Sequence, residues 1–375
     1  MVGKPIRVLA VVYRLIPGGL ENRLMDIIRN IDTSRVVIDV FSYHPEAGIY
    51  DEEVKRFGGR VFYNPPLNVK NMLWYVRYFK RFLEAHPEYR IVHAHQDAWC
   101  SVFCKGAYLA GVPVRIAHSR TALASNSLTN FIKNIIKLPT KRYANYLFAV
   151  SEKAGRWLYG DKAFDAGRVE IWPNSIEARR FYYDPAVREA VRAENNWNGK
   201  YVVMHVGNFT LPKNHPFILE VFSRVRERDR DALLVLVGDG DRARINGLIE
   251  SNGCGDAVQL LGTRTDVNRL LQGGDVFLFP SIYEGLPGAL VEAQAAGLPC
   301  VISDTIAREV HITPNLKILS LSAKATDWAD SILKYKDFER SDTRRYIEEK
   351  RFDVRGLAKD LCRFYEDAYR QSPND

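Results

Sequence analysis

Short apolar runs recur along the whole chain, and most are followed by a stretch in which apolar residues return every three or four positions. The short runs are typical of strands buried on both faces, and the longer spacing is typical of amphipathic helices. The first half contains the predicted strands 6–12, 36–42, 60–63, 91–93, 114–117, 147–150 and 169–172. The second half contains the predicted strands 201–206, 233–237, 258–261, 276–279, 299–302 and 317–320.

The segments between these strands predict helices at residues 21–31, 72–85, 98–110, 216–228, 241–252, 266–273 and 288–296. Alternating strands and helices form parallel sheets with helices on both faces, so the sequence predicts an α/β protein. A length of 375 residues exceeds what one core usually sustains, which favours two doubly wound domains in series.

The boundary between the two domains is expected within residues 174–199, where polar residues accumulate and no strand is predicted. We place the first domain at residues 1–180 and the second at residues 181–353. A final predicted helix at residues 354–370 packs back on the first domain, so residues 354–375 are assigned to it.

The most informative loop joins the predicted strand 276–279 to the predicted helix 288–296. Pro287 suits the first position of a helix, and Gly285 and Gly288 let a ligand approach the backbone closely. The first N–H groups of a helix lack partners within it and the helix dipole is positive there, so this end suits a diphosphate. Glu284 and Glu292 frame the turn, where their carboxylates can hold hydroxyl groups on either side of the diphosphate. A nucleotide sugar has this layout, with hexose and ribose hydroxyls at opposite ends.

Charge is distributed unevenly along the chain, whose formal net charge is +8. Residues 1–180 contain 27 Lys and Arg against 16 Asp and Glu, whereas the remaining residues contain 26 against 29. A basic half suggests an anionic partner, either membrane lipid or phosphate. Residues 131–138 mix apolar side chains with lysines and are followed by Lys141 and Arg142. This stretch fits a helix lying on an anionic membrane and equally a helix packed on the core with a solvated face.

The cysteines indicate neither a disulfide framework nor a zinc site, because five of them are scattered with no Cys-x2-Cys pair. This usage is typical of a reducing compartment. The chain begins with a predicted strand rather than a signal peptide, and no apolar run approaches the roughly 20 residues that span a bilayer. We therefore expect a cytoplasmic protein, with the inner face of the plasma membrane as its candidate contact.

Several short motifs follow one another along the chain in a fixed order. They are Gly18-Gly19-Leu20-Glu21, residues 91–95 (IVHAH), 115–119 (RIAHS), 150–152 (VSE), 173–176 (PNSI), 207–214, 237–240 (VGDG), 262–266 and the block 284–292. Together they resemble a GT-B glycosyltransferase of the large retaining family 4, with the bacterial exopolysaccharide and capsule transferases as the nearest likeness. The resemblance covers nearly the whole chain and implies two Rossmann-like domains that face a cleft.

For the donor, the resemblance implies that Glu284 meets the hexose hydroxyls and Glu292 the ribose. The backbone of the turn, which includes Gly285, Leu286, Pro287 and Gly288, is then expected to carry the β-phosphate. Gly18 and Gly19 follow the first strand, where an absent side chain lets the backbone approach the same ligand.

Lys213 follows the predicted strand 201–206, where its ammonium group can neutralise the leaving diphosphate as charge develops. The family usually pairs this lysine with an arginine, and Asn208 stands in that place here. Asparagine donates hydrogen bonds but supplies no charge, so Arg14, Arg120 or Arg264 are candidate substitutes. We assign Arg264 to the nucleotide base or phosphate.

The resemblance places His118 where the donor meets the acceptor, and there it accepts the acceptor's proton or orients hydroxyl groups. Lys213, Glu284 and His118 are therefore the predicted catalytic residues. His93 and His95 could form a metal pair, but the sequence supplies no obvious third ligand, so we expect neither a metal nor another cofactor.

The predicted activity is retaining transfer of a hexose-type sugar from a UDP- or GDP-sugar to a glycan or lipid-linked glycan of the cell surface, without a nucleic-acid partner. An alternative is a non-catalytic subunit that binds the donor or activates another transferase, which the charge missing at Asn208 suggests. A third reading, an NAD-linked epimerase, is disfavoured because Gly238-Asp239-Gly240 lacks a third glycine in the required place.

Overall fold

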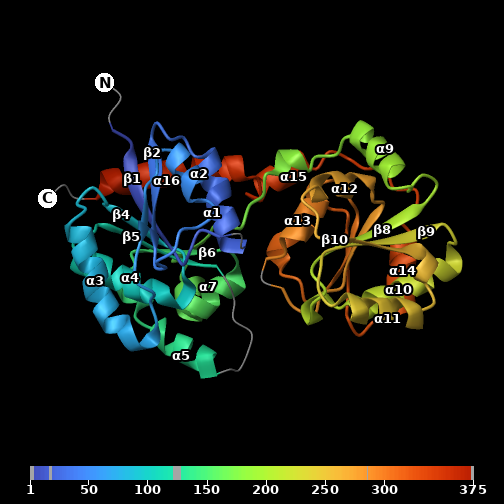
Figure 1. The fold of residues 1–375 in the computed structure, drawn as a ribbon, viewed down its shortest axis with the longest axis horizontal. Coiled ribbons are helices and arrows are strands. Elements are labelled where there is room, and N and C mark those ends of the chain that lie inside the picture. Colours follow the sequence, from blue (N-terminus) through green and yellow to red (C-terminus); the bar gives the residue numbers. More distant parts are fainter. Residues whose placement is uncertain (1–3, 17–18, 121–127, 285, 373–375) are drawn as a thin grey trace. The chain divides into compact units, whose positions relative to one another are not determined.

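The computed structural model describes residues 4–16, 19–120, 128–284 and 286–372 (Figure 1). The chain divides into two compact units, Met1–Ser175 with Val354–Asp375, and Ile176–Asp353. The first unit ends at Ser175, before the predicted boundary at residue 180. The backbone N–H of Ile176 donates to the carbonyl of Phe352 at 2.9 Å, which ties the chain entering the second unit to the chain leaving it.

The first unit is built on a seven-stranded sheet in the order β3-β2-β1-β4-β5-β6-β7. Every pairing in it is parallel. The strands are β1 (Ile6–Val12), β2 (Val36–Ser42), β3 (Val61–Tyr63), β4 (Ile91–Ala94), β5 (Val114–Ser119), β6 (Tyr146–Ala149) and β7 (Val169–Ile171). Because β1 and β4 are neighbours, the chain reverses its direction of winding between these two strands.

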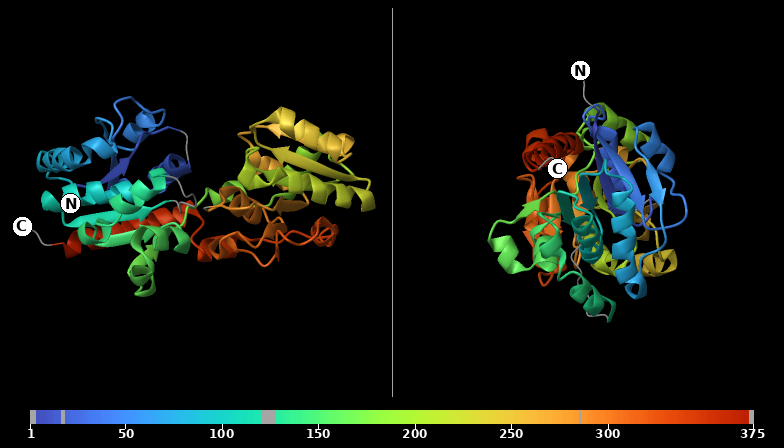
Figure 2. Two further views of the ribbon diagram at one scale, coloured as in Figure 1. Left: turned by 90° about the horizontal axis from the view of Figure 1, so that it is seen from below. Right: turned by 90° about the vertical axis from the view of Figure 1, so that its left-hand side faces the viewer.

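Helices connect the strands of the first unit and cover the sheet. They are α1 (Gly19–Asn30), α2 (Asp51–Arg56), α3 (Met72–Glu84), α4 (Cys100–Leu109), α5 (Leu128–Ile136), α6 (Thr140–Tyr143), α7 (Glu152–Tyr159), α8 (Asp161–Asp165) and α16 (Val354–Gln371). The last helix, α16, packs against α1 and the sheet, as its red ribbon shows in Figures 1 and 2. The buried face of α16 contributes Leu357, Leu361 and Tyr365 to the core.

The second unit contains a six-stranded parallel sheet in the order β10-β9-β8-β11-β12-β13. Its strands are β8 (Tyr201–Val206), β9 (Ala232–Val237), β10 (Val258–Gly262), β11 (Val276–Phe279), β12 (Cys300–Ser303) and β13 (Leu316–Leu319). Its helices are α9 (Pro185–Glu194), α10 (His215–Arg228), α11 (Arg242–Ser251), α12 (Val267–Gly273), α13 (Gly288–Ala295), α14 (Ala325–Leu333) and α15 (Arg344–Glu349). Here the winding reverses between β8 and β11.

The predicted doubly wound α/β class is confirmed, and each predicted strand coincides with an observed one to within a residue or two. Helix α9 was not predicted, because residues 174–199 were interpreted as a polar linker. Its start is nevertheless encoded locally, since the Asp184 side chain caps the N–H of Ala186 at 2.9 Å and Pro185 occupies the first turn.

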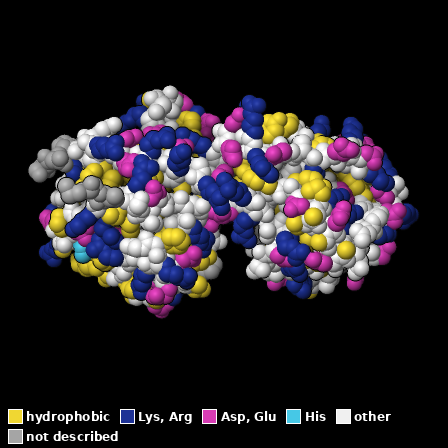
Figure 3. All heavy atoms as spheres, turned by 90° about the horizontal axis from the view of Figure 1, so that it is seen from above, with side chains coloured by type: hydrophobic (Ala, Val, Ile, Leu, Met, Phe, Trp, Pro, Cys, Tyr) yellow, Lys and Arg dark blue, Asp and Glu magenta, His cyan; other side chains and the backbone are white. Residues whose placement is uncertain are grey.

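Three further findings concern the surface, the cysteines and the length of the helices. On the face shown in Figure 3, Lys and Arg side chains are interspersed with acidic and apolar ones. All five cysteines are buried with free thiols. Within the described ranges, no helix combines the length and the apolar character needed to cross a bilayer.

Candidate functional site

The reversals of winding locate the candidate site. In an open α/β sheet, ligands bind beyond the carboxyl ends of the strands at the place where the strand order reverses. In the second unit this place lies between the loops that follow β8 and β11, and these loops carry Lys213 and Glu284. In the first unit it lies between the ends of β1 and β4, next to β5, which carries His118.

Lys213 ends a short 3₁₀ turn, Leu211–Lys213, that follows β8. The next residue, Asn214, adopts the left-handed conformation (φ 58°), which an asparagine tolerates better than most residues. Its side-chain amide donates to the carbonyl of Pro280 at 3.2 Å, and the N–H of Ile282 donates to the carbonyl of Pro212 at 2.8 Å. The loops after β8 and β11 are therefore joined to each other.

This joining brings two predicted catalytic side chains together. Lys213 Nζ lies 2.7 Å from Glu284 Oε1, and only 18% and 14% of the two side chains are exposed. The ammonium group also lies 4.6 Å from the centre of the Phe279 ring. The stem of Lys213 crosses Gly207, where an added Cβ would come within 2.9 Å of Lys213 Cε. Gly207 thus leaves the space in which the lysine lies.

Helix α13 begins next to this pair. Pro287 occupies the N-cap rather than the predicted first helical position, because its ψ of 99° is extended and the helix starts at Gly288. The N-cap residue, Pro287, makes no side-chain capping hydrogen bond. Leu286 packs against the core, and Glu292 lies half-buried inside the helix. The predicted Gly285 falls outside the described residues.

Asn208 and Arg264 lie in the loops after β8 and β10. Asn208 is exposed, and its side-chain oxygen accepts a long hydrogen bond (3.4 Å) from the N–H of Asp239. Arg264 is held by both oxygens of Asp266, at 2.7 Å each. A cation that the sequence analysis missed, Arg242, lies against Gly262, where an added Cβ would be 2.6 Å from Arg242 Nη2.

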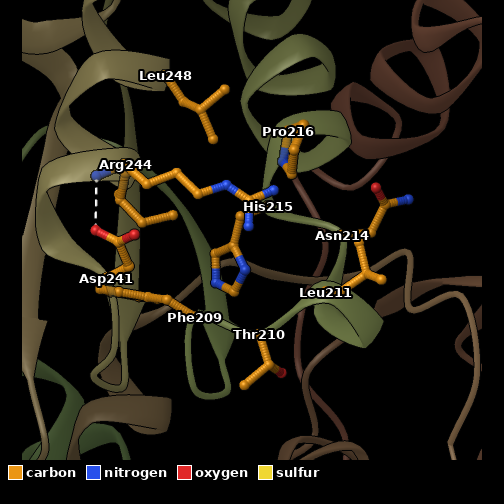
Figure 4. A pocket seen from close by; sticks show the side chains of 10 residues that line it. Phe209, Thr210, Leu211, Asn214, His215, Pro216, Asp241, Arg244 and Leu248 are labelled. Carbon is orange, nitrogen blue, oxygen red and sulfur yellow. Dashed lines mark hydrogen bonds between the residues drawn. The ribbon is translucent and has the colours of Figure 1, made fainter.

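A pocket of about 40 Å³ lies between the loop after β8 and helices α10 and α11, and none of the predicted donor residues lines it. In Figure 4 the guanidinium of Arg244 extends toward the ring of His215. Burial, with Lys213 and Arg244 nearby, lowers the pKa of His215 to about 4. The imidazole is therefore neutral at physiological pH.

In the first unit, His118 near the end of β5 joins a cluster of buried histidines. His118 Nδ1 lies 3.0 Å from His93 Nε2, and His93 Nδ1 lies 2.7 Å from the hydroxyl of Tyr365. The rings of His93 and His95 stack with their centres 3.9 Å apart. Burial lowers the pKa of all three histidines well below the ordinary value, so they are neutral.

Arg120 completes this cluster. Its Nη2 lies 2.7 Å from His95 Nδ1 and its Nη1 donates to Asn174 Oδ1 at 3.0 Å. Burial lowers the pKa of Arg120 to about 10, so the guanidinium stays charged. The N–H of Arg120 donates to Asp97 Oδ1 at 2.6 Å, which ties the residue after β5 to the loop that follows β4.

The expectation that no third ligand accompanies His93 and His95 is wrong. His118, which is distant in the sequence, places a ring nitrogen within 4.8 Å of theirs. The chemistry of the cluster nevertheless disfavours a metal. The guanidinium of Arg120, which is hydrogen-bonded to His95, repels a divalent cation. Both ring nitrogens of His93 already take part in hydrogen bonds. The three histidines are better suited to a hydrogen-bonded chain.

The remaining predicted residues are distributed as follows. Gly19 opens α1, whereas Gly18 falls outside the described residues. Arg14 pairs with Glu46 at 2.8 Å. The sequence analysis included Gly207 only as the first residue of the motif 207–214, and it did not single out Tyr365. Gly207 had a readable signal, since it directly follows a predicted strand, but Tyr365 looks like any apolar position of an amphipathic helix.

Comparison with known proteins agrees with this geometry. The family described as "Glycosyltransferase Family 4" matches residues 17–180, and that described as "Glycosyl transferases group 1" matches residues 200–336. A protein of Bacillus subtilis (strain 168) named as the glycosyltransferase EpsF is 36% identical over 87% of this chain and 86% of its own length. An Escherichia coli enzyme, named UDP-Gal:alpha-D-GlcNAc-diphosphoundecaprenol alpha-1,3-galactosyltransferase, is 26% identical over 65% of this chain and 66% of its own.

A solved structure has the same fold. Anabaena Alr3699/HepE in complex with UDP and glucose superposes with a TM-score of 0.74 at 18% identity, covering 96% of this chain and all of that one. The fold, the two family matches and the 36% identical relative agree with one another. The chain therefore belongs to the family 4 glycosyltransferases and has their GT-B fold.

Proposed function

We propose that this chain is a retaining glycosyltransferase of cell-surface polysaccharide synthesis. It moves a hexose-type sugar from a nucleotide diphosphate sugar, UDP- or GDP-linked, to a glycan or lipid-linked glycan. Lys213, Glu284 and His118 are the proposed catalytic residues. Catalysis on this proposal needs no divalent metal, because the ammonium of Lys213 supplies positive charge to the leaving diphosphate.

The observation that carries the proposal is the contact between Lys213 and Glu284 at the reversal of winding in the second unit. A cation and a carboxylate within 2.7 Å of each other, beside a helix whose N-cap residue is a proline without a capping side chain, present complementary groups to a sugar diphosphate. The ammonium and the first helical N–H groups suit the phosphates, and the carboxylate suits sugar hydroxyls.

The reaction we propose retains the configuration at the anomeric carbon. The acceptor hydroxyl attacks this carbon on the face from which the diphosphate departs, and the bond between the carbon and the β-phosphate oxygen breaks. The acceptor's proton passes to the leaving phosphate oxygen, so the products are a glycoside and a nucleoside diphosphate. Lys213 lowers the barrier by stabilising negative charge that grows in the transition state.

Relatives support the choice of donor and acceptor. The E. coli relative is named for a UDP-sugar donor and a diphosphoundecaprenol-linked acceptor, and the Anabaena structure holds UDP and glucose. A relative from Staphylococcus aureus, 24% identical over 96% of this chain, is named for capsular polysaccharide biosynthesis. An acceptor anchored in lipid requires the enzyme to work at the inner face of the membrane, which the exposed apolar residues of α5 would favour.

The test is transfer by the purified chain from labelled UDP- and GDP-sugars to lipid-linked glycan acceptors, with product anomers assigned by NMR. We expect Lys213→Met and Glu284→Gln each to lower kcat by roughly 100-fold or more. Matched controls are Lys200→Met and Glu227→Gln, which remove members of surface pairs with Asp231 and Arg224 in the same unit. Inversion of configuration, or full activity of both site variants, would overturn the proposal.

Asn208 favours a second candidate function, that of a non-catalytic subunit that binds the donor. Its amide supplies no charge, and Arg264 is occupied by Asp266. If the wild-type chain binds UDP-sugars in calorimetry but transfers no sugar until a partner transferase is added, this candidate replaces the enzyme. Transfer by the chain alone excludes it.

A further inference from the structure

A chain of hydrogen bonds leads from the C-terminal helix to His118. The hydroxyl of Tyr365 on α16 lies 2.7 Å from His93 Nδ1, and His93 Nε2 lies 3.0 Å from His118 Nδ1. All three side chains are buried, with at most 3% of each residue exposed. His118 Nε2 is the end of the chain, and this atom is buried with no hydrogen-bond partner among the described residues.

The Tyr365 hydroxyl determines which atom donates in each of these hydrogen bonds. Within the described part of the chain, His93 Nδ1 is the hydrogen-bond partner of the Tyr365 hydroxyl. Burial raises the pKa of this tyrosine far above physiological pH, so the hydroxyl keeps its proton. A buried O–H that fails to donate loses its bond at a substantial cost, so it donates to His93 Nδ1.

The remaining protons are then fixed one after another. A neutral imidazole carries one proton, so His93, accepting at Nδ1, carries its proton on Nε2. That N–H donates to His118 Nδ1, and the proton of His118 is therefore on Nε2.

We infer that Tyr365 and His93 are positioning residues that set the tautomer of His118, so that His118 presents an Nε2–H donor to the substrate and does not act as a general base. The catalytic consequence rests on the proposed function, since it supposes that His118 meets the substrate. The tautomer itself does not depend on that supposition.

The surroundings of His118 fit a single oxygen acceptor. His118 and Arg120 share a cavity of about 10 Å³ whose other walls include Phe148, Trp172 and Leu361. This volume holds about one water-sized atom. Among the lining residues, His118 and Arg120 can donate hydrogen bonds to one oxygen atom, and most of the other walls are apolar.

Of the two roles that the sequence left open for His118, the orientation of hydroxyl groups is the one that fits this tautomer. A neutral imidazole protonated on Nε2 has no lone pair free there to take the acceptor's proton. It can orient a hydroxyl by donating to its oxygen, and the acceptor's proton then goes to the leaving phosphate. This division removes the need for a protein base in the retaining step.

The direct test is the tautomer of His118, measured in long-range ¹H–¹⁵N spectra of the full chain labelled with ¹⁵N-histidine. The chain has eight histidines, and signals lost in His118→Gln and His93→Gln variants assign the two of interest. We expect the wild type to show a protonated Nε2 and an unprotonated Nδ1 at His118. A proton on Nδ1 would overturn the inference, and this measurement needs no variant to be active.

Tyr365→Phe tests the positioning role, because it keeps the ring and removes the hydroxyl. We expect both tautomers of His118 to become populated and kcat to fall roughly tenfold, as for the loss of one buried hydrogen bond. The matched control is Tyr369→Phe, one turn further along α16, whose ring stacks against the guanidinium of Arg90. We expect it to change neither quantity.

The outcomes separate the two proposals. An unchanged tautomer and unchanged kcat in Tyr365→Phe would overturn the positioning role of Tyr365. A wild-type chain that shows the expected tautomer but transfers no sugar supports the hydrogen-bonded chain and counts against the proposed function alone. Thermal unfolding of each variant shows that it is folded before its tautomer or its kcat is interpreted.

Discussion

Lys213 Nζ lies 2.7 Å from Glu284 Oε1, so the two groups proposed to contact opposite parts of a sugar diphosphate contact each other in the structure. Both side chains are more than four-fifths buried, which makes the pair less screened than a surface ion pair. A ligand that brings phosphate to the lysine and hydroxyls to the carboxylate must compete with this contact. The competition predicts different effects for the two halves of the pair.

Glu284→Gln removes the competing carboxylate charge while keeping the shape of the side chain. We expect it to leave UDP affinity unchanged or raise it, because Lys213 is freed for phosphate, while sugar transfer falls. Lys213→Met is expected to weaken UDP binding roughly tenfold, the loss of one charge-assisted contact. Calorimetry with UDP measures both. An equal loss of UDP affinity in the two variants would contradict the assignment of phosphate to Lys213 and hydroxyls to Glu284.

Gly207→Ala is predicted to disturb the lysine without unfolding the unit. The added Cβ would lie 2.9 Å from Lys213 Cε and 3.0 Å from His205 Nε2, and the flexible lysine stem is the group that can move. We expect a stability change within about 1 kcal/mol and a fall in transfer rate of roughly tenfold or more, because the ammonium shifts from its place.

The control for this variant is Gly247→Ala in α11, where an added Cβ meets nothing within 4 Å. Alanine is the better helix former there, so stability should be unchanged or higher by about 0.5–1 kcal/mol and activity should be unaffected. A loss of activity in Gly247→Ala as large as that in Gly207→Ala would show that the effect is not local to Lys213.

Much of the second-unit site could be predicted from the sequence because its parts are local. β8 and β11 are apolar runs followed directly by Gly207 and Pro280, so their loops could be located. The chemistry of Lys213 and Glu284 was readable from these loops. Their contact was not foreseen, because it depends on β8 and β11 being neighbours in the sheet.

The histidine cluster shows where sequence reasoning stops. His93 and Tyr365 are 272 residues apart, and nothing in an amphipathic helix distinguishes a tyrosine that holds a histidine from one that fills the core. The search for a third ligand near His93 and His95 failed for the same reason, since β4 and β5 bring His118 beside them. Contacts between neighbouring strands carry no signal in the spacing along the chain.

The transfer activity of the His118→Gln variant distinguishes a hydrogen-bond donor from a general base at this position. A glutamine amide can place an N–H near the position of Nε2 but cannot take up a proton. We expect His118→Gln to retain about a tenth of wild-type kcat and His118→Ala to lose roughly 100-fold, because the glutamine replaces the hydrogen-bond donor and the alanine removes it. If the two variants are equally inactive in steady-state transfer assays, His118 does more than donate a hydrogen bond.

The stability of the first unit should depend on pH through Asp39 of β2. This carboxylate is fully buried and accepts hydrogen bonds from Arg7 at 2.6 Å, Tyr89 at 2.7 Å and the N–H of Arg60 at 2.6 Å. Burial alone would raise the pKa of Asp39, but these bonds outweigh it and lower the pKa. The unfolded chain therefore binds the proton more tightly than the folded one.

The direction of the pH dependence of stability follows from this difference in the pKa of Asp39 between the folded and the unfolded chain. The stabilisation by Asp39 is fully present above the unfolded pKa of about 3.9 and is lost as the pH falls through the lower folded pKa. Asp39→Asn is expected to destabilise the unit by about 3 kcal/mol at neutral pH, because Arg7 loses its carboxylate partner and Arg60 retains Glu88 but loses Asp39. Hydrogen exchange of the β1 and β2 amides measures this. The control, Asp32→Asn, removes an exposed carboxylate and should change little.

Helix α5 and the residues after it are predicted to contact an anionic membrane through Phe131 and Ile135 of the helix and Leu138 beyond its end, whose exposed fractions are 63%, 53% and 67%. Exposed Lys141 and Arg142 follow directly and can attract acidic lipid headgroups. Replacing the three apolar residues by serine should weaken binding to phosphatidylglycerol vesicles roughly tenfold or more in flotation assays, because their transfer out of water drives insertion. The matched control is Ile49→Ser, which removes a side chain 73% exposed elsewhere on the same unit. Binding that is lost equally in the control, or that persists on neutral vesicles in the triple variant, would assign membrane contact to another surface.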